Sequence, residues 1–166
     1  MRHELFLVRH AIAAERGPEW PDDAARPLTP KGIRRFSEAV EGLARFGLEL
    51  DEVFTSPLVR ASHTARVLAE GLPQPPAVHV LDVLAPGHPP EAVLEQVHAV
   101  ATAVRIAIVG HEPDLGRLAA HLLGASYAPE FRKGAICRID VDRVDPGVRG
   151  TLVWFAPPGM LRRMAG

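Results

Sequence analysis

The sequence predicts an α/β fold in three layers, with helices on both faces of a mostly parallel central sheet. Short apolar runs that suit buried strands alternate with segments whose apolar residues recur at helical spacing. Two strand-like segments near the C-terminal end, joined by Asp145-Pro146-Gly147, predict an antiparallel edge. The 166 residues, 47% of them hydrophobic, suffice for one core, so we expect a single domain over residues 1–166.

The N-terminal half is predicted to hold two strands and two helices separated by a long loop. Leu5–Val8 is a continuous apolar run, which is typical of a strand buried on both faces at the centre of a sheet. Residues 11–28 are rich in Pro, Asp, Glu and Gly and lack sustained periodicity, so they predict a long loop, and loops of this length more often have a function than not. Thr29 as N-cap and Pro30 as first helical residue predict a helix that ends at Gly47. The N-terminal half ends with a predicted strand at Glu52–Thr55 and a predicted helix that begins at Ser56-Pro57.

The C-terminal half continues the alternation of strands and helices. Val78–Leu84 predicts a strand, and Pro89-Pro90 starts a helix that reaches about Ala101. Arg105–Val109 is another buried apolar strand, and Asp114 is expected to cap a further helix. The last two strands are expected at Ala135–Val141 and Thr151–Phe155.

Composition excludes several classes of protein. A net charge of −1 gives no overall basic field, so no nucleic-acid partner is expected. The apolar runs are far shorter than a bilayer requires and Met1-Arg2-His3-Glu4 shows no secretory signal, so we expect a cytoplasmic protein without a membrane partner. The single cysteine, Cys137, excludes an internal disulfide, and the alternation around it predicts a buried structural residue.

Candidate site residues follow the predicted strands. Ligands of open α/β sheets bind beyond the carboxyl ends of the strands, and Arg9-His10 and His111 lie at two such ends. Arg60 lies on the first turn of a predicted helix, where backbone N–H groups also favour anions. Guanidinium groups match phosphate oxygens well, so the set predicts a site for a dianionic phosphoryl group. Any one of these residues alone could equally be an ordinary surface or structural residue.

A metal site is the alternative that the eight histidines raise. No two of them have the i, i+4 helical spacing or the Cys-His pattern of a zinc site. Arginines beside the histidines would also repel a divalent cation. We therefore expect no metal.

Four segments, in this order along the chain, carry a resemblance to a known family: Leu7-Val8-Arg9-His10-Ala11, Arg26-Pro27-Leu28-Thr29-Pro30-Lys31-Gly32, Thr55-Ser56-Pro57-Leu58-Val59-Arg60-Ala61 and Val109-Gly110-His111-Glu112-Pro113. With them the chain resembles the histidine phosphatase superfamily, which has the phosphoglycerate mutase-like fold, and within it the SixA-type phosphohistidine phosphatases. The resemblance covers most of the chain.

The resemblance implies a role for each candidate residue. It makes His10 a nucleophile that forms a phosphohistidine intermediate, with Arg9, Arg60 and His111 holding the phosphoryl group. It also suggests that Arg26, in the loop before the first predicted helix, reaches the mouth of the site. It implies no metal or organic cofactor.

The general acid and the substrate are the less defined parts of this hypothesis. Asp82 is either the acid that protonates the leaving group or simply a polar residue at a strand end. A short chain leaves the pocket open, which favours a phosphohistidine on another protein as substrate. The alternatives are a small-molecule phosphomonoesterase of the same superfamily and an inactive module that binds phosphorylated partners. No oligomeric state is predicted.

Overall fold

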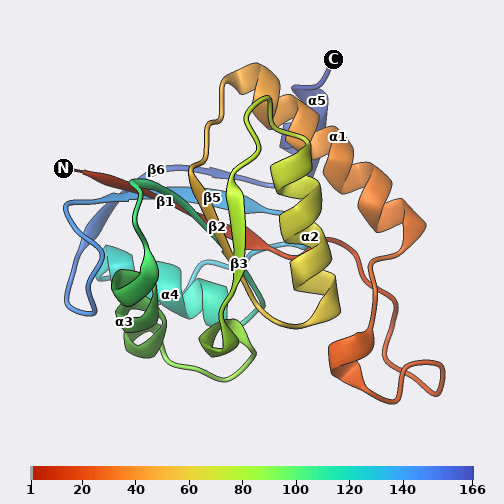
Figure 1. Cartoon of the computed structure of the whole chain (residues 1–166), viewed down its shortest axis with the longest axis horizontal. Helices are drawn as coiled ribbons and strands as arrows, with labels where there is room; N and C mark the ends of the chain where they lie inside the picture. Colours follow the sequence, from red (N-terminus) through yellow and green to blue (C-terminus); the bar gives the residue numbers. More distant parts are fainter. Residues whose placement is uncertain (1) are drawn as a thin grey trace.

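Six strands form one mixed sheet in the computed structural model, which describes residues 2–166 (Figure 1). The spatial order is β3-β2-β4-β1-β5-β6. The strands are β1 (His3–Arg9), β2 (Glu52–Thr55), β3 (Ala77–Val80), β4 (Arg105–Gly110), β5 (Ile136–Val141) and β6 (Gly150–Ala156). The first four strands are mutually parallel, whereas β5 runs antiparallel to both β1 and β6. This confirms the mostly parallel sheet with an antiparallel edge.

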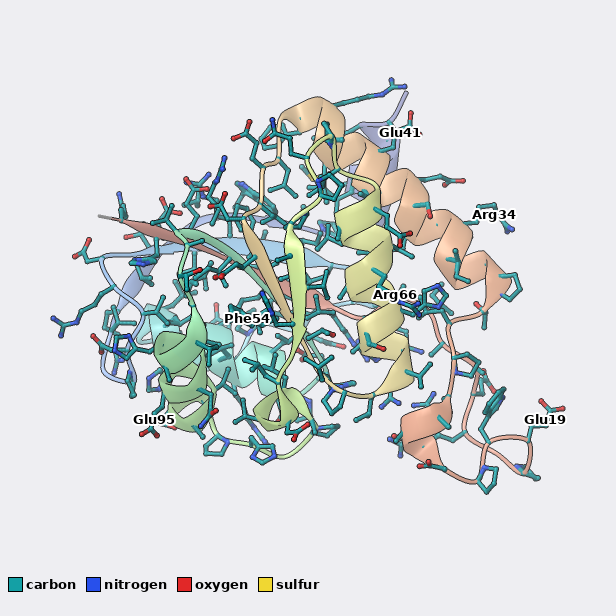
Figure 2. The ribbon with its side chains drawn as sticks, in the orientation of Figure 1. Glu19, Arg34, Glu41, Phe54, Arg66 and Glu95 are labelled. Carbon is teal, nitrogen blue, oxygen red and sulfur yellow. The ribbon has the colours of Figure 1, made fainter. Side chains whose placement is uncertain are left out.

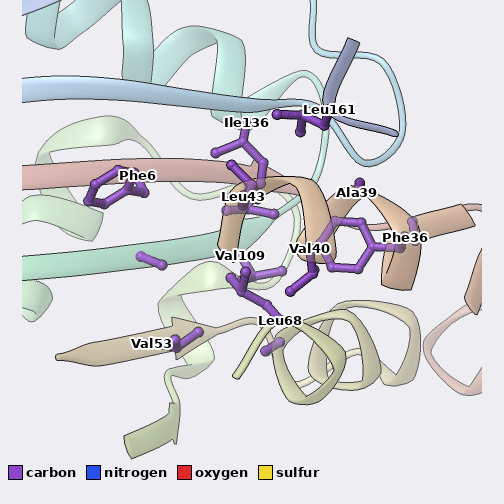
Figure 3. Close-up of a cluster of buried hydrophobic side chains, with 14 of the residues drawn as sticks. Phe6, Phe36, Ala39, Val40, Leu43, Val53, Leu68, Val109, Ile136 and Leu161 are labelled. Carbon is purple, nitrogen blue, oxygen red and sulfur yellow. The ribbon is translucent and has the colours of Figure 1, made fainter. Parts of the chain in front are cut away.

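Helices cover both faces of the sheet and make three layers (Figure 1). The α-helices are α1 (Pro30–Phe46), α2 (Val59–Glu70), α3 (Pro90–Val100), α4 (Asp114–Leu123) and α5 (Pro158–Arg163), and the 3-10 helices are η1 (Asp23–Ala25) and η2 (Asp82–Leu84). Alternate residues of β1 divide the core, because Phe6 and Val8 pack with α1, α2 and α5 while Leu5 and Leu7 pack with α3 and α4. Figure 3 shows the first of these clusters, with Phe36 and Val40 of α1 beside the sheet. None of the helices in the described range is long and apolar enough to span a bilayer.

The predicted boundaries of α1 are confirmed by its caps. The Thr29 side chain accepts a hydrogen bond from the Gly32 N–H at 2.9 Å, and Pro30 is the first helical residue. Gly47 ends the helix in the left-handed conformation, with φ of 88°, which glycine adopts at low cost. Cys137 is also confirmed as a buried residue of β5.

Three local predictions are wrong. The strand predicted over Val78–Leu84 ends at Val80, because its neighbour β2 has only four residues to pair with and the chain turns into η2. Helix α2 begins at Val59 rather than at Ser56. Asp114 is the first residue of α4 and not its cap, and its carboxylate accepts from the Gly87 N–H of a neighbouring loop. Helices η1 and α5 were not predicted.

Candidate active site

The ends of β1 and β4 bring the candidate residues together. The two strands are adjacent and parallel, with Arg9 in register with Gly110, and the His10 N–H donates to the Gly110 carbonyl. The rings of His10 and His111 consequently lie 5.3 Å apart, centroid to centroid. Arg60, on the first turn of α2, is close enough to affect the protonation of both rings. The site predicted from the sequence is therefore assembled at this edge of the sheet.

The His10 ring is held in one tautomer. Its Nδ1 lies 2.7 Å from the Ala11 carbonyl oxygen, which can only accept, so Nδ1 carries the hydrogen and Nε2 keeps its lone pair. The Ala11 segment is fixed in turn because its N–H donates to the Thr64 hydroxyl of α2. Burial, with the charges of Arg60 and Arg9, lowers the pKa of His10 to about 4, against the raising effect of its hydrogen bond to Ala11. The ring is neutral at physiological pH.

The His111 ring is also buried and neutral. Its Nε2 lies 2.8 Å from the Ser56 hydroxyl, which also accepts from the Leu58 N–H. Burial is the main cause that lowers the pKa of His111 to about 3, followed by the charges of His10 and Arg60. Its second nitrogen, Nδ1, is buried and has no hydrogen-bond partner.

Buried side-chain nitrogens without hydrogen-bond partners are concentrated at this site, within the described part of the chain. Four buried side-chain polar atoms over residues 2–166 lack a partner, and they are His3 Nδ1, Arg9 Nε, Arg60 Nε and His111 Nδ1. Three of the four belong to the candidate site. A guanidinium Nε–H can only donate, and leaving a buried donor unpaired costs roughly 1–3 kcal/mol. The site is therefore suited to a ligand rich in acceptor oxygens.

Asp23 of η1 is a site residue that sequence reasoning missed. Its carboxylate and its backbone carbonyl both accept hydrogen bonds from Arg60, at 3.0 and 2.8 Å, although Arg60 lies 37 residues away. Arg16 and Arg26 also pair with this carboxylate. Burial would raise the pKa of Asp23, but its contacts with Arg26 and Arg60 hold it below its ordinary value. The only hint in the sequence was the unusual length of the loop over residues 11–28.

One end of this loop lies against the site, through the contact of Asp23 with Arg60. Figure 2 shows its tip, marked by Glu19, projecting away from the sheet. The Asp23 carboxylate, near the C-terminal end of the loop, forms a salt bridge with Arg60. Arg26 is nearly buried and binds the Ala14 carbonyl and Asp23. It is thus connected to Arg60 through a shared carboxylate.

Asp82 has no comparable connection. It lies exposed at the start of η2, at the same end of the sheet, because the Leu81 N–H bonds to the last residue of β2. The charged groups with the largest effect on the protonation of His10 are the cations Arg60, Arg9 and Lys133. The role of Asp82 as the general acid stays a prediction. Glu112, half-buried beside Arg9 and with a pKa raised by burial, accepts from the N–H of Gly116 and stabilises the start of α4.

The donor set of the site does not suit a metal ion. Over residues 2–166 no three His, Cys, Asp or Glu side chains lie close enough together to hold a metal ion. Two neutral imidazoles beside two guanidinium groups favour an anion instead. One histidine with a free lone pair, surrounded by unpartnered donors, is equipped to attack a bound phosphoryl group.

Comparisons with known proteins agree with this geometry. The family model of the histidine phosphatase superfamily (branch 1) matches residues 5–84. The chain is 27% identical to the phosphohistidine phosphatase SixA of Escherichia coli (strain K12) over 161 residues, 96% of each protein. It is 39% identical over 120 residues, 70% of each, to an uncharacterized protein of Picosynechococcus sp. (strain ATCC 27264 / PCC 7002 / PR-6). A solved structure of the protein histidine phosphatase SixA complexed with tungstate superposes with a TM-score of 0.81 and 26% identity, covering 94% of this chain and 97% of that one.

The matched segment, residues 5–84, includes Arg9, His10, Asp23, Arg26 and Arg60. The superposed structure has the same α/β architecture over nearly its whole length. The resemblance found in the sequence is therefore confirmed: the chain belongs to the histidine phosphatase superfamily and is a phosphatase similar to SixA.

Proposed function

We propose that this phosphatase hydrolyses phosphohistidine on another protein, with His10 as the nucleophile and Arg9, Arg60 and His111 as the phosphoryl-binding residues. The observation that carries the proposal is that three of the four unpartnered buried nitrogens belong to those three residues. A phosphoryl group offers three non-bridging oxygens, which such donors would satisfy. Among the described residues, no other buried side-chain nitrogens without a partner lie together in this way.

In the first step, Nε2 of His10 attacks phosphorus in line with the bond that breaks. The lone pair of Nε2 forms the new N–P bond, and the leaving group departs with the electrons of the old one. Nδ1 keeps its hydrogen and its bond to the Ala11 carbonyl, so the ring does not have to reorient. We assign the Ser56 hydroxyl as the donor to Nε2 of His111, 2.8 Å away, which places the hydrogen of that ring on Nδ1 as a donor to the phosphoryl oxygens.

In the second step, water attacks the phosphorus of the phosphohistidine. The N–P bond breaks, inorganic phosphate leaves, and the lone pair returns to Nε2. The low pKa of His10 keeps Nε2 deprotonated after release, so the enzyme is ready for another substrate.

Two observations support a phosphohistidine substrate. An imidazole whose other nitrogen is protonated leaves as a neutral molecule, so it needs little help from an acid, unlike an alkoxide. This suits a nucleophile whose protonation is affected most by cationic neighbours, Arg60, Arg9 and Lys133. The relatives with similar sequence and structure include a phosphohistidine phosphatase and a protein histidine phosphatase.

The test compares turnover of a phosphohistidine protein, a phosphoserine peptide and several sugar phosphates at equal concentration. We expect the first to be preferred, and His10→Asn to lower turnover by at least a thousandfold while His98→Asn, at an exposed position, leaves it unchanged. A base-stable phosphoenzyme should form with the wild type and with His98→Asn, but not with His10→Asn.

Each result bears on a different part of the proposal. Preference for sugar phosphates would overturn the substrate and favour a small-molecule phosphomonoesterase, and unchanged turnover in His10→Asn would overturn the nucleophile. Asp82→Asn in the same assay should slow ester substrates more than phosphohistidine if Asp82 is the acid.

A further inference from the structure

A second cationic site lies next to the candidate active site. It is a cavity of about 360 Å³ between α1, the loop before β5, and α5. Five cationic side chains line it, and we call it the basic pocket: Arg35, Arg132, Lys133, Arg162 and Arg163.

The charges of the basic pocket are not neutralised by the protein. No Asp or Glu lines the cavity. Among residues 2–166, none of the five cations forms a salt bridge. Elsewhere the arginines are commonly paired, as Arg105 is with Asp51 and Arg138 with Asp140. Five like charges around one cavity repel one another, in a chain whose net charge is only −1, and this indicates a site for an anionic ligand.

The basic pocket shares its wall with the active site. Ala11, which accepts the hydrogen bond of the His10 ring, also lines the pocket. Gly134, another lining residue, donates its N–H to the carbonyls of Arg9 and His10 at 3.1 Å each. Lys133 is close enough to lower the pKa of His10. The basic pocket therefore lies beside the position at which His10 would hold a phosphoryl group.

We propose that the basic pocket binds an acidic stretch of the substrate protein, next to its phosphohistidine. The inference rests on the proposed function and adds the feature that the enzyme recognises around the phosphorylated residue. Buried arginines with fixed partners, such as Arg60, suit a single phosphoryl group, whereas four of the five pocket cations are exposed and spread over three segments. Exposed, dispersed cations suit several carboxylates on a protein surface and accelerate association by long-range attraction.

The test uses two synthetic phosphohistidine peptides, one with Asp and Glu around the phosphohistidine and one with Ser and Gln, and para-nitrophenyl phosphate as a substrate without a second anion. The pocket variant is Arg35→Glu with Arg163→Glu, both at solvent-accessible positions. The matched control is Arg34→Glu, on the same helix, where it points away from the sheet (Figure 2).

The wild type should have a kcat/KM for the acidic peptide at least tenfold above that for the neutral peptide, with the difference shrinking as salt rises. The pocket variant should lose this preference through KM, while its activity on para-nitrophenyl phosphate stays within about twofold of the wild type. Arg34→Glu should behave as the wild type. Equal kcat/KM for the two peptides, or an equal loss in the pocket variant and in Arg34→Glu, would overturn the proposal.

A binding measurement separates this proposal from the proposed function. Fluorescence anisotropy of the labelled acidic peptide without its phosphoryl group should show binding to the wild type that the pocket variant weakens at least tenfold. If neither phosphopeptide is hydrolysed but this binding persists, the proposal of a phosphohistidine substrate is refuted, and the proposal that the basic pocket binds an acidic peptide is supported. If the pocket binds a single-stranded DNA oligomer of equal charge more tightly than the peptide, the ligand is a nucleic acid and the proposal is wrong.

Discussion

The two buried imidazoles at the active site should make the protein sensitive to acid. His10 and His111 are 6% and 4% exposed, and burial lowers their pKa values to about 4 and about 3. In the unfolded chain each ring takes up a proton near pH 6.5, whereas in the folded protein it stays neutral to a much lower pH. The free energy of unfolding is therefore unaffected by these rings above pH 6.5. It falls as the pH drops from 6.5 toward the folded pKa values.

The size of the effect follows from the two pKa values. At pH 5 an unfolded imidazole is almost fully protonated while the folded His10 is still about nine-tenths neutral, which costs about 2 kcal/mol of stability. The same reasoning gives about 2 kcal/mol for His111. Together the rings should remove about 4 kcal/mol between pH 8 and pH 5, a large part of the roughly 5–15 kcal/mol that stabilises a typical domain.

Urea unfolding at pH 8 and pH 5 measures this loss for the wild type and for His10→Asn. The asparagine amide keeps a donor near the Ala11 carbonyl but does not titrate, so the variant should lose about 2 kcal/mol less than the wild type over this range. His98→Asn, which removes an exposed imidazole, is the matched control and should keep the full wild-type loss. If His10→Asn loses as much stability as the wild type, the buried neutral state of His10 is refuted.

Two further perturbations test the geometry around the site. Inorganic phosphate at about 100 times its dissociation constant should stabilise the wild type by about 2.7 kcal/mol, seen as a rise in Tm. Arg60→Gln should abolish the rise whereas Arg66→Gln, on the exposed face of α2, should keep it; a rise retained in Arg60→Gln would refute Arg60 as an oxyanion ligand. Gly32→Ala would place a Cβ 2.1 Å from the Ile12 carbonyl oxygen, so urea unfolding should show a loss of about 1–3 kcal/mol. Gly17→Ala, where nothing lies within 4 Å, is the control, and equal stability of the two variants would contradict the close approach of α1 to Ile12.

The basic pocket could not have been found from the sequence. Arg35, Lys133 and Arg163 are far apart along the chain, and each alone reads as an ordinary solvated cation. Only the packing of α5 against α1 brings them around one cavity, and α5 itself was not predicted because its six residues are too short for a periodic signal. The absence of acidic residues from the cavity is likewise a property of the fold.

Strand β3 ends earlier than the sequence predicts, and this end also depends on a contact between distant segments. The apolar pattern over Val78–Leu84 is compatible with a strand, but a strand also needs a neighbour to pair with, and β2 ends at Thr55. The chain therefore turns into η2 and leaves Asp82 exposed. Asp23 lies in a loop without periodicity, so the local sequence did not indicate that its carboxylate contacts Arg60.

The sequence by itself determined the alternation of strands and helices, the antiparallel edge, and the four residues that meet at the end of the sheet. The spacing of apolar residues and the capping residues determine helices and strands from the local sequence. The carboxyl ends of parallel strands lie at the same edge of a sheet, so the order of the residues was enough to place Arg9, His10 and His111 together. Tertiary structure alone decided the tautomer and pKa of His10, the contact of Asp23 with Arg60, and the basic pocket. These features depend on burial and on contacts between distant segments, and neither can be deduced from the local pattern of residues.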